Sequence, residues 1–313
     1  LPYWAVSSYP NSARGEAQAR ADFWNDTGPN GTVASSANPS MQDRFVQMWK
    51  FVASRYALEK TIVAYDLFNE PGVFSSDGRI ALYNNTKLVT ETLPSFYARV
   101  VDAIRTIDDN HMIIWEPAAI WRRIPYSVDE PNVVFSPHYP GGGIYSYDGR
   151  KVRFEVALKT ILELSEEWNQ PVLIGEWGIC AQVANAAQYI RDLADLLDRY
   201  LIGWTWWTYG KSNFGMSLLD KAGLERTVLV QNLVRPFVLS SSFRPSFSSF
   251  DPDKKELTIG VEGPGQVRIC LPSTRYPSFT VNVDTGNVSW TIVSNILTAI
   301  VLSETSQLII RVH

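Results

Sequence analysis

Short apolar runs and helix-like stretches alternate five times along residues 61–235 of the chain. The apolar runs begin near residues 61, 111, 132, 171 and 202. Stretches in which apolar residues recur at helical spacing lie between most of these runs and after the last one. Alternation of this kind is typical of a parallel sheet built from β-α units. We therefore expect an α/β domain over residues 1–235, with its chemistry at the carboxyl ends of the strands.

Two of these runs end in a glutamate. Residues 61–64 lead into Tyr65-Asp-Leu-Phe-Asn69-Glu70-Pro71-Gly72, and because proline and glycine do not continue a strand, Glu70 is expected at its carboxyl end. A carboxyl group beside apolar residues retains its proton more readily, which suits a general acid. Residues 171–178 repeat the arrangement around Glu176. Paired carboxylates are typical of glycosidases in which one is acid and base and the other nucleophile.

Further polar and aromatic residues follow the other expected strands. His138 and Tyr139 come after the third run, and Trp207 lies near the end of the last. A flat aromatic face suits the apolar side of a sugar ring, although core packing is the commoner role for any single tryptophan. Glu116 directly follows the second run, so it is a rival to Glu70 for the acid role.

Four motifs in this order resemble a known family. Asn69-Glu70-Pro71 and Gly175-Glu176-Trp177-Gly178 resemble the two catalytic signatures of glycoside hydrolase family 5. Ser136-Pro137-His138-Tyr139 resembles its histidine-containing strand end, and Gly203-Trp204-Thr205-Trp206-Trp207 resembles its last barrel strand. The layout looks most like the endoglycoceramidase group. The resemblance implies a (β/α)8 TIM barrel and a retaining hydrolase that cleaves β-linked glucosyl or galactosyl glycans or glycolipids by double displacement.

Roles for four residues come with this resemblance. Glu70 would be acid and base, and Glu176 the nucleophile. Asn69 would donate a hydrogen bond to the sugar hydroxyl next to the anomeric carbon, and Trp207 would stack on the sugar. We expect no metal and no cofactor, because the carboxylates carry the proton and covalent chemistry.

The residue that keeps Glu176 ionised is left open by the sequence. Tyr139 or His138 would serve. The family usually places its tyrosine two residues after the histidine, where this chain has Pro140, so Tyr145 competes for the role.

Two other classes of function are alternatives to a glycosidase. A metal-dependent hydrolase is disfavoured, because the chain has only three histidines and no H-x-H, H-E-x-x-H or Cys-His spacing. A catalytically silent relative, acting as a carbohydrate-binding or structural component of an assembly, stays open because part of the family pattern is absent.

The pattern changes after Arg235-Pro236. Residues 236–313 contain short alternating runs separated by turn residues, which predicts a C-terminal antiparallel β-sandwich. The segment resembles the sandwich appended to endoglycoceramidase-like enzymes, and we expect it to shield the barrel rather than to bind carbohydrate.

We expect the barrel to be incomplete in this chain. In the family, the strand that carries Glu70 is the fourth, so strands 4–8 are recognisable and strands 1–3 are missing. Residues 1–40, rich in Pro, Ser, Asn and Gly, are expected to form a long loop. We expect the missing strands to come from a second polypeptide, for example the amino-terminal part of the same precursor.

Charge, hydropathy and sequence motifs limit the possible partners and location of the protein. The net charge of −4 gives no electrostatic footprint for nucleic acid, and no apolar run has the length of a membrane span. The chain opens with Leu rather than Met and shows no leader, so processing or truncation is expected. The two cysteines are expected to be free thiols. Secretion, or a lumenal location, is favoured by the glycosylation sequons at Asn25, Asn30, Asn84 and Asn287.

Overall fold

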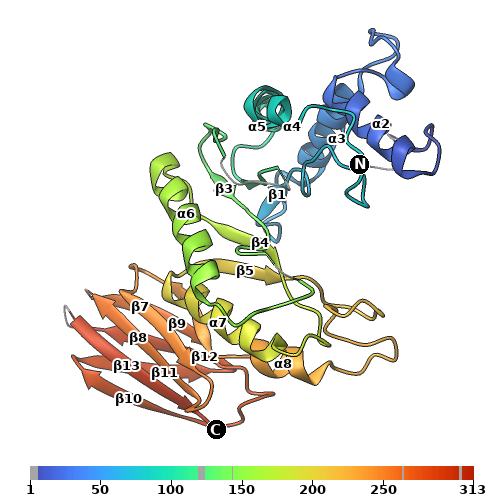
Figure 1. The fold of residues 1–313 in the computed structure, drawn as a ribbon. Coiled ribbons are helices and arrows are strands. Elements are labelled where there is room, and N and C mark those ends of the chain that lie inside the picture. Colours follow the sequence, from blue (N-terminus) through green and yellow to red (C-terminus); the bar gives the residue numbers. More distant parts are fainter. Residues whose placement is uncertain (1–5, 119–123, 143, 263, 303–304) are drawn as a thin grey trace. The chain divides into compact units, whose positions relative to one another are not determined.

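The computed structural model describes residues 6–118, 124–142, 144–262, 264–302 and 305–313. The chain forms two compact units, in which the elements follow one another as labelled in Figure 1. The first unit contains Leu1–His138 and Glu163–Val172, and the second contains Tyr139–Leu162 and Leu173–His313. Both units contain parallel strands, and the second also contains an all-β part.

The first unit combines helices with a three-stranded parallel sheet. The sheet has the order β1-β2-β3, formed by β1 (Ala64–Asp66), β2 (Met112–Trp115) and β3 (Val133–Phe135). All three residues of β3 are buried, as expected for a strand covered on both faces. The helical elements are α2 (Ala13–Trp24), the 3₁₀ turn η1 (Pro29–Gly31), α3 (Met41–Tyr56), α4 (Asn85–Lys87), the π-helical turn η2 (Leu88–Thr92) and α5 (Leu93–Arg105).

An aromatic cluster packs these helices against the segment that precedes Glu70. The ring centroid of Phe23 lies between 4.8 and 5.9 Å from those of Trp24, Phe45, Phe68 and Phe96. These rings come from α2, α3, α5 and the loop after β1. Because Phe68 belongs to that loop, the cluster restrains the backbone two residues before the candidate acid.

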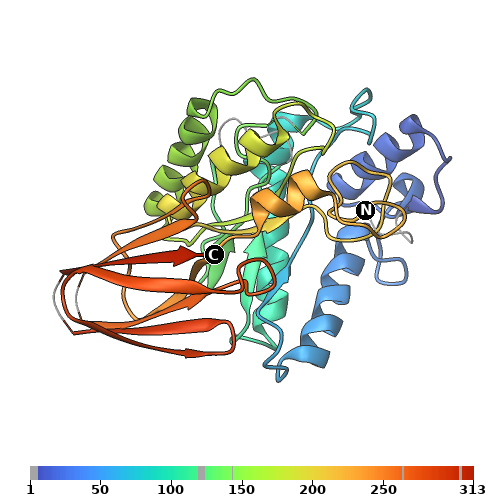
Figure 2. The ribbon, with the colours of Figure 1, turned by 90° about the horizontal axis from the view of Figure 1, so that it is seen from below.

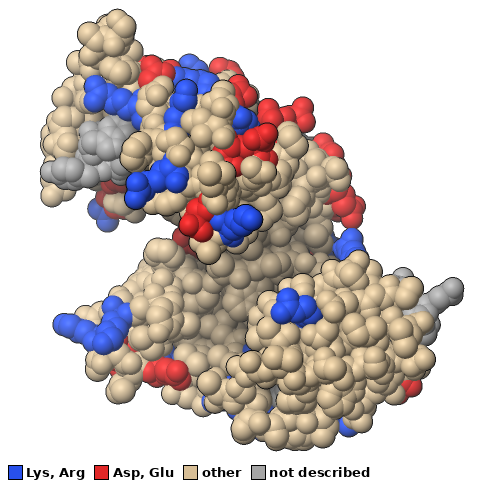
Figure 3. Space-filling view, turned by 180° about the vertical axis from the view of Figure 1, so that it is seen from behind, with Lys and Arg blue, Asp and Glu red and all other residues tan. Residues whose placement is uncertain are grey.

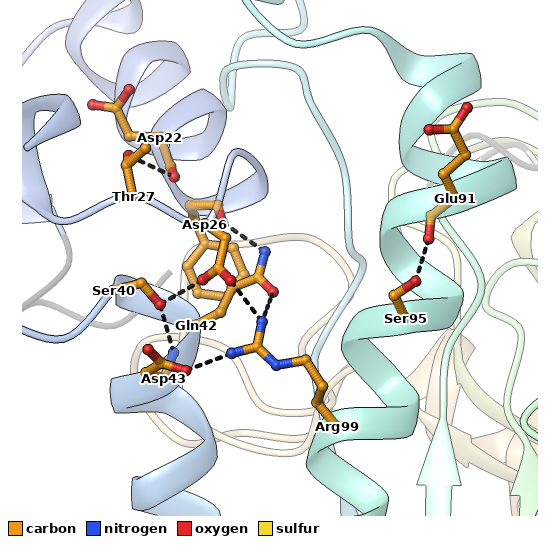
Figure 4. Close-up of polar contacts among 10 residues, drawn as sticks. Asp22, Asp26, Thr27, Ser40, Gln42, Asp43, Glu91, Ser95 and Arg99 are labelled. Atoms are coloured by element: carbon orange, nitrogen blue, oxygen red, sulfur yellow. Dashed lines mark hydrogen bonds and ion pairs between the residues drawn. The ribbon is translucent and has the colours of Figure 1, made fainter. Parts of the chain in front are cut away.

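A polar network joins α3 and α5 nearby (Figure 4). The Arg99 guanidinium donates to the Asp26 carboxylate at 2.7 Å and to the Gln42 amide oxygen at 3.0 Å. Ser40 caps α3, because its Oγ accepts from the Asp43 backbone N–H at 3.0 Å, and it also donates to Asp26.

The second unit begins with the remaining α/β elements. They are α6 (Val152–Trp168), β4 (Leu173–Trp177), α7 (Ala186–Arg199), β5 (Gly203–Trp206) and α8 (Thr227–Leu233). Strands β4 and β5 pair in parallel, with Leu173 opposite Gly203. The last residues of α6 belong to the first unit.

The C-terminal part is an antiparallel β-sandwich. Its sheets have the orders β10-β13-β8-β7 and β11-β12-β9-β6, and residues from both sheets share one buried apolar core. Figure 2 shows α7 and α8 beside this sandwich, and few charged side chains lie over it, at the lower right, in Figure 3. The strands are β6 (Phe237–Ser241), β7 (Phe247–Asp251), β8 (Glu256–Glu262), β9 (Gly265–Cys270), β10 (Phe279–Thr285), β11 (Val288–Val293), β12 (Ile296–Val301) and β13 (Thr305–Val312).

The structure confirms the five parallel strands and the all-β segment, and it corrects two local expectations. Residues 1–40 are not one long loop, because α2 occupies 13–24; its helical period is hard to see since several of its buried positions are alanines. The first strand covers Ala64–Asp66 rather than 61–64, and Val63 is 68% exposed. Within 236–313, the alternating runs that begin near residues 256, 266, 278, 289 and 307 correspond to β8, β9, β10, β11 and β13, whereas β6, β7 and β12 were not predicted.

Both cysteines are free thiols, as expected. The last helix of the α/β part ends at Leu233 and β6 begins at Phe237, whereas the two compact units divide the chain elsewhere. A domain boundary at residue 235 therefore stays a prediction from the change of pattern.

Candidate active site

Glu70 lies on the loop that follows β1, with a backbone conformation that is unusual for its type. Its φ angle is 44°, in the left-handed region that residues with a β-carbon seldom adopt. Its backbone N–H donates to Glu116 Oε2 at 2.7 Å. The Glu70 side chain is 38% exposed, so the carboxyl group is open to a ligand on one side.

The His138 ring lies between two carboxyl groups of the first unit. Its Nδ1 is 3.1 Å from Glu70 Oε1, and its Nε2 is 3.3 Å from Glu116 Oε1. The His138 side chain is 7% exposed and that of Glu116 only 2%. Each of the two contacts needs one hydrogen, supplied either by the ring nitrogen or by the carboxyl group.

Tyr97 supports this group from α5. Its hydroxyl donates to the Glu116 backbone oxygen at 2.7 Å. Burial raises the pKa of Tyr97 well above its usual range, so the hydroxyl keeps its proton. Sequence reasoning assigned Tyr97 no part in the site, because nothing in a helix nineteen residues earlier in the chain signals a contact with a strand end.

Glu176 lies within β4, in the second unit, and is partly buried. Tyr139 contacts it twice: the Tyr139 hydroxyl donates to Glu176 Oε2 at 3.1 Å, and the Tyr139 backbone N–H donates to the Glu176 backbone oxygen at 2.8 Å. Tyr145, the competing tyrosine, is 68% exposed. Of the two candidates, Tyr139 is therefore the one placed against the Glu176 carboxyl group.

The residues around Glu176 show why its motif contains glycine and tryptophan. Trp177 is fully buried, with its ring centroid 5.0 Å from that of Trp206. A β-carbon on Gly178 would lie 2.7 Å from Met216 Cε and 2.8 Å from the Trp207 backbone oxygen. This close approach of two chain segments requires glycine at position 178.

The remaining predicted residues lie at strand ends and are accessible. Asn69 is exposed beside Glu70 in the first unit. Trp207 follows β5 in the second unit, where its backbone N–H donates to the Trp177 oxygen at 3.0 Å. Its side chain is 43% exposed, so part of the indole is available to a ligand.

Among the described residues, none of the helices has both the length and the apolar character needed to cross a membrane.

Comparison with known proteins was made at the level of sequence and of structure. Residues 21–213 match the family described as Cellulase (glycosyl hydrolase family 5). An endoglycoceramidase from Cyanea nozakii is 25% identical over 248 residues, which cover 71% of this chain and 43% of the relative. An endoglucanase from Paenibacillus polymyxa is 28% identical over 154 residues, or 44% of this chain and 39% of the relative. The chain thus spans less than half the length of these curated relatives.

Two solved structures share the fold. Endo-glycoceramidase II from Rhodococcus sp., described as a lactosyl-enzyme intermediate, aligns with a TM-score of 0.75 and 22% identity, over 99% of this chain and 74% of that one. An endogalactoceramidase aligns with a TM-score of 0.67 and 20% identity, over 100% of this chain and 71% of that one. The similarities imply the TIM barrel with a C-terminal sandwich that the sequence predicted. Endoglycoceramidases are among the proteins that this chain resembles, and, with more than half of its residues matched by the family model, the chain belongs to glycosyl hydrolase family 5.

Proposed function

We propose that this chain carries the catalytic glutamates of a retaining glycosidase that works by double displacement. One observation carries the proposal: each of the two glutamates has its own polar partner. Glu70 contacts His138, which can exchange a proton, and Glu176 accepts a hydrogen bond from Tyr139, which stabilises a carboxylate. The environments of the two glutamates differ in the way that an acid and a nucleophile require.

The proposed reaction has two steps. In the first, protonated Glu70 gives its proton to the glycosidic oxygen as the bond to the leaving group breaks, and the Glu176 carboxylate bonds to the anomeric carbon. In the second, water attacks that carbon, Glu70 takes the proton from the water, and Glu176 is released. The mechanism requires the two carboxyl groups to lie about 5–5.5 Å apart. Asn69 would bind the hydroxyl next to the anomeric carbon, and Trp207 would stack on the sugar.

The proposed substrate is a β-linked glucosyl or galactosyl glycan or glycolipid. Support comes from relatives described as endoglycoceramidase and endoglucanase, and from a structural neighbour described as an endogalactoceramidase. Screening aryl β-glycosides together with glucosylceramide-type lipids would test the proposal. Cleavage of α-linked substrates alone would refute it.

Two substitutions and one covalent probe test the catalytic roles. Glu70→Gln and Glu176→Gln should each lower the rate by at least about 10²–10⁴, because each removes a group that moves a proton or forms a bond. Glu167→Gln, on an exposed position of α6, is the matched control and should keep full activity. A 2-deoxy-2-fluoro glycoside should label the wild-type protein on the peptide containing Glu176. If either variant kept most of its activity, the substituted glutamate would not be a catalytic residue.

One observation favours the alternative of a catalytically silent chain. Among the described residues, β1 is an edge strand, with β2 as its only strand partner. Phe51, Leu58 and Val63, which lie before β1, are 67%, 93% and 68% exposed. An unpaired edge with exposed apolar residues is unusual in a soluble protein. If this chain acts alone as a binding or structural component, the fluorosugar should leave it unlabelled.

We propose instead that β-α units outside this chain pair with β1 and complete the barrel. They would supply strands 1–3, either from the same precursor or from a second polypeptide. Mass spectrometry of the purified active protein, recorded after denaturation, shows which polypeptides are present. It distinguishes a longer precursor, a second polypeptide and this chain alone. An active monomer consisting of this chain alone would refute the proposal.

Secretion, or a lumenal location, is proposed from the sequons. All four sequon asparagines, Asn25, Asn30, Asn84 and Asn287, are exposed, as a glycan acceptor must be. A loss of mass after treatment with a glycan-removing amidase would support the proposal. Unmodified asparagine at all four positions in the native protein would contradict it.

A further inference from the structure

We propose that Glu116 is a positioning residue for the proton transfer assigned to Glu70, an inference that rests on the function proposed above. Glu116 directly follows β2 and is 2% exposed. A carboxylate buried to this degree needs partners for its oxygens. Each oxygen of Glu116 has a partner. Oε2 accepts from the Glu70 backbone N–H at 2.7 Å, and Oε1 is 3.3 Å from Nε2 of His138, the residue that contacts the Glu70 carboxyl group.

The first contact holds the Glu70 backbone in place. A φ angle of 44° is costly for a residue with a β-carbon and persists only where the surroundings impose it. A hydrogen bond from a backbone N–H to a buried carboxylate is stronger than one between neutral groups, so it can offset this cost. Glu116 thereby fixes the direction in which the Glu70 side chain leaves the loop.

The second contact selects the nitrogen of His138 that carries hydrogen. Because an ionised carboxylate only accepts, Glu116 keeps the proton on Nε2. The other nitrogen, Nδ1, then faces Glu70 Oε1 at 3.1 Å and can accept from the protonated carboxyl group. After Glu70 has given its proton to the leaving group, the Nδ1 lone pair faces an ionised oxygen. That repulsion favours return of a proton from the attacking water to Glu70.

Glu116 is itself fixed by its surroundings. The fully buried Tyr97 of α5 donates to its backbone oxygen at 2.7 Å. The titratable groups near Glu116 include His138, Tyr97 and Glu70, and Tyr126 and Asp66 lie close enough to act on Tyr97. The sequence offered Glu116 as a rival acid. In the structure Glu116 is almost fully buried and its carboxyl group contacts the Glu70 backbone.

The test compares leaving groups that need acid catalysis with ones that do not. For phenyl β-cellobioside or β-lactoside, Glu116→Gln should lower kcat/KM about 10- to 100-fold, a part of the 10²–10⁴ that acid-base catalysis contributes. For the 2,4-dinitrophenyl glycoside of the same sugar, the loss should be about threefold or less, because this leaving group departs without a proton. Glu167→Gln, with the same charge change at an exposed position, should alter neither value.

The outcomes separate this inference from the function on which it rests. If the wild-type protein is inactive when assayed together with the units that complete its barrel, or if Glu70→Gln shows no dependence on the leaving group, the proposed function fails. If Glu70→Gln behaves as expected but Glu116→Gln matches the control or loses both substrates equally, only the positioning role fails.

A spectroscopic reading covers the case in which Glu116→Gln is too unstable to assay. The chain has three histidines, so ¹⁵N ring signals can be assigned with His138→Gln as reference. In wild type, the neutral ring of His138 should carry its proton on Nε2. In Glu116→Asp, whose shorter side chain keeps the charge but lengthens the contact, the signals should indicate a mixture of tautomers. A wild-type ring protonated on Nδ1 alone would overturn the proposal.

Discussion

Replacing Arg235 by methionine would remove one half of a buried ion pair beside the sandwich. The Arg235 and Asp198 side chains are 3% and 10% exposed, and Nη1 lies 3.0 Å from Asp198 Oδ2. Arg235 also donates to the Asn232 backbone oxygen at 3.2 Å, and its guanidinium lies 5.7 Å from the Phe250 ring centroid. The pair therefore links α7, the end of α8 and β7 within the second unit.

The magnitude follows from the burial of the partner. Removing one member of a buried pair typically costs about 3–5 kcal/mol, because the other charge is left without compensation. Methionine fills a similar volume, so the cavity contribution should be small. The free energy of unfolding at pH 8 should fall by this amount in Arg235→Met.

The cost should depend on pH with a defined sign. Burial raises the pKa of Asp198 from 3.8 to about 6, although Arg235 opposes the rise. The folded protein thus holds this proton more tightly than the unfolded chain, so the contribution of Asp198 to stability is greatest below about pH 4 and is lost as the pH rises through about 6. Without Arg235 the pKa rises further. At pH 5 the carboxyl group in Arg235→Met is then neutral, and the cost falls to about 1–2 kcal/mol for the lost hydrogen bonds.

The free energy of unfolding is measured in urea at pH 5 and at pH 8. Asp198→Asn and the double variant with Arg235→Met and Asp198→Asn complete a double-mutant cycle. At pH 8 the double variant should be more stable than Arg235→Met, because no charge is left buried. The matched control is Arg191→Met, since the 3.1 Å pair of Arg191 with Asp253 also joins α7 to the sandwich but is 44% and 82% exposed. That control should cost at most about 1 kcal/mol. An Arg235→Met cost equal at the two pH values, or no larger than the control, would refute the reasoning.

Three further predictions concern the cap, the tight glycine and the tyrosine of the site. Ser40→Ala should lower the free energy of unfolding by about 1 kcal/mol, measured in urea, because α3 loses its N-cap. Gly178→Ala should cost about 1–3 kcal/mol in the same assay, since its β-carbon would lie 2.8 Å from the Trp207 backbone oxygen. Tyr139→Phe should lower kcat/KM about 10- to 100-fold on aryl β-glycosides without loss of stability, because Glu176 loses a hydrogen bond to its ionised form.

Each of these has an outcome that contradicts it. Ser40→Ala as stable as wild type would mean that the polar network around Asp26, not the cap, holds this end of α3. Wild-type stability in Gly178→Ala would show that the adjoining segment yields easily. For Tyr139→Phe, an unchanged rate together with a loss in Tyr145→Phe would restore the competing tyrosine.

The sequence determined the parallel strands and most of the longer helices, because local patterns are enough to specify them. Strands such as 133–135 are entirely apolar and bounded by turn residues, so their existence follows from burial on both faces. Pro94 lies in the first turn of α5, the part of a helix in which proline is tolerated. The two glutamates were found in the same way, since each follows or ends an apolar run at a proline or glycine.

Contacts between distant segments were decided only by the tertiary structure. Adjacent parallel pairing of β1 and β2, with Ala64 opposite Met112, brings the loop of Glu70 to the end of β2, where Glu116 receives its N–H. The choice of Tyr139 over Tyr145 depends on a left-handed backbone angle of 45° at Tyr139, which its sequence does not signal. The sequence can place a carboxyl group at a strand end, but its partner depends on strand order and backbone direction, which only the packing of the whole unit sets.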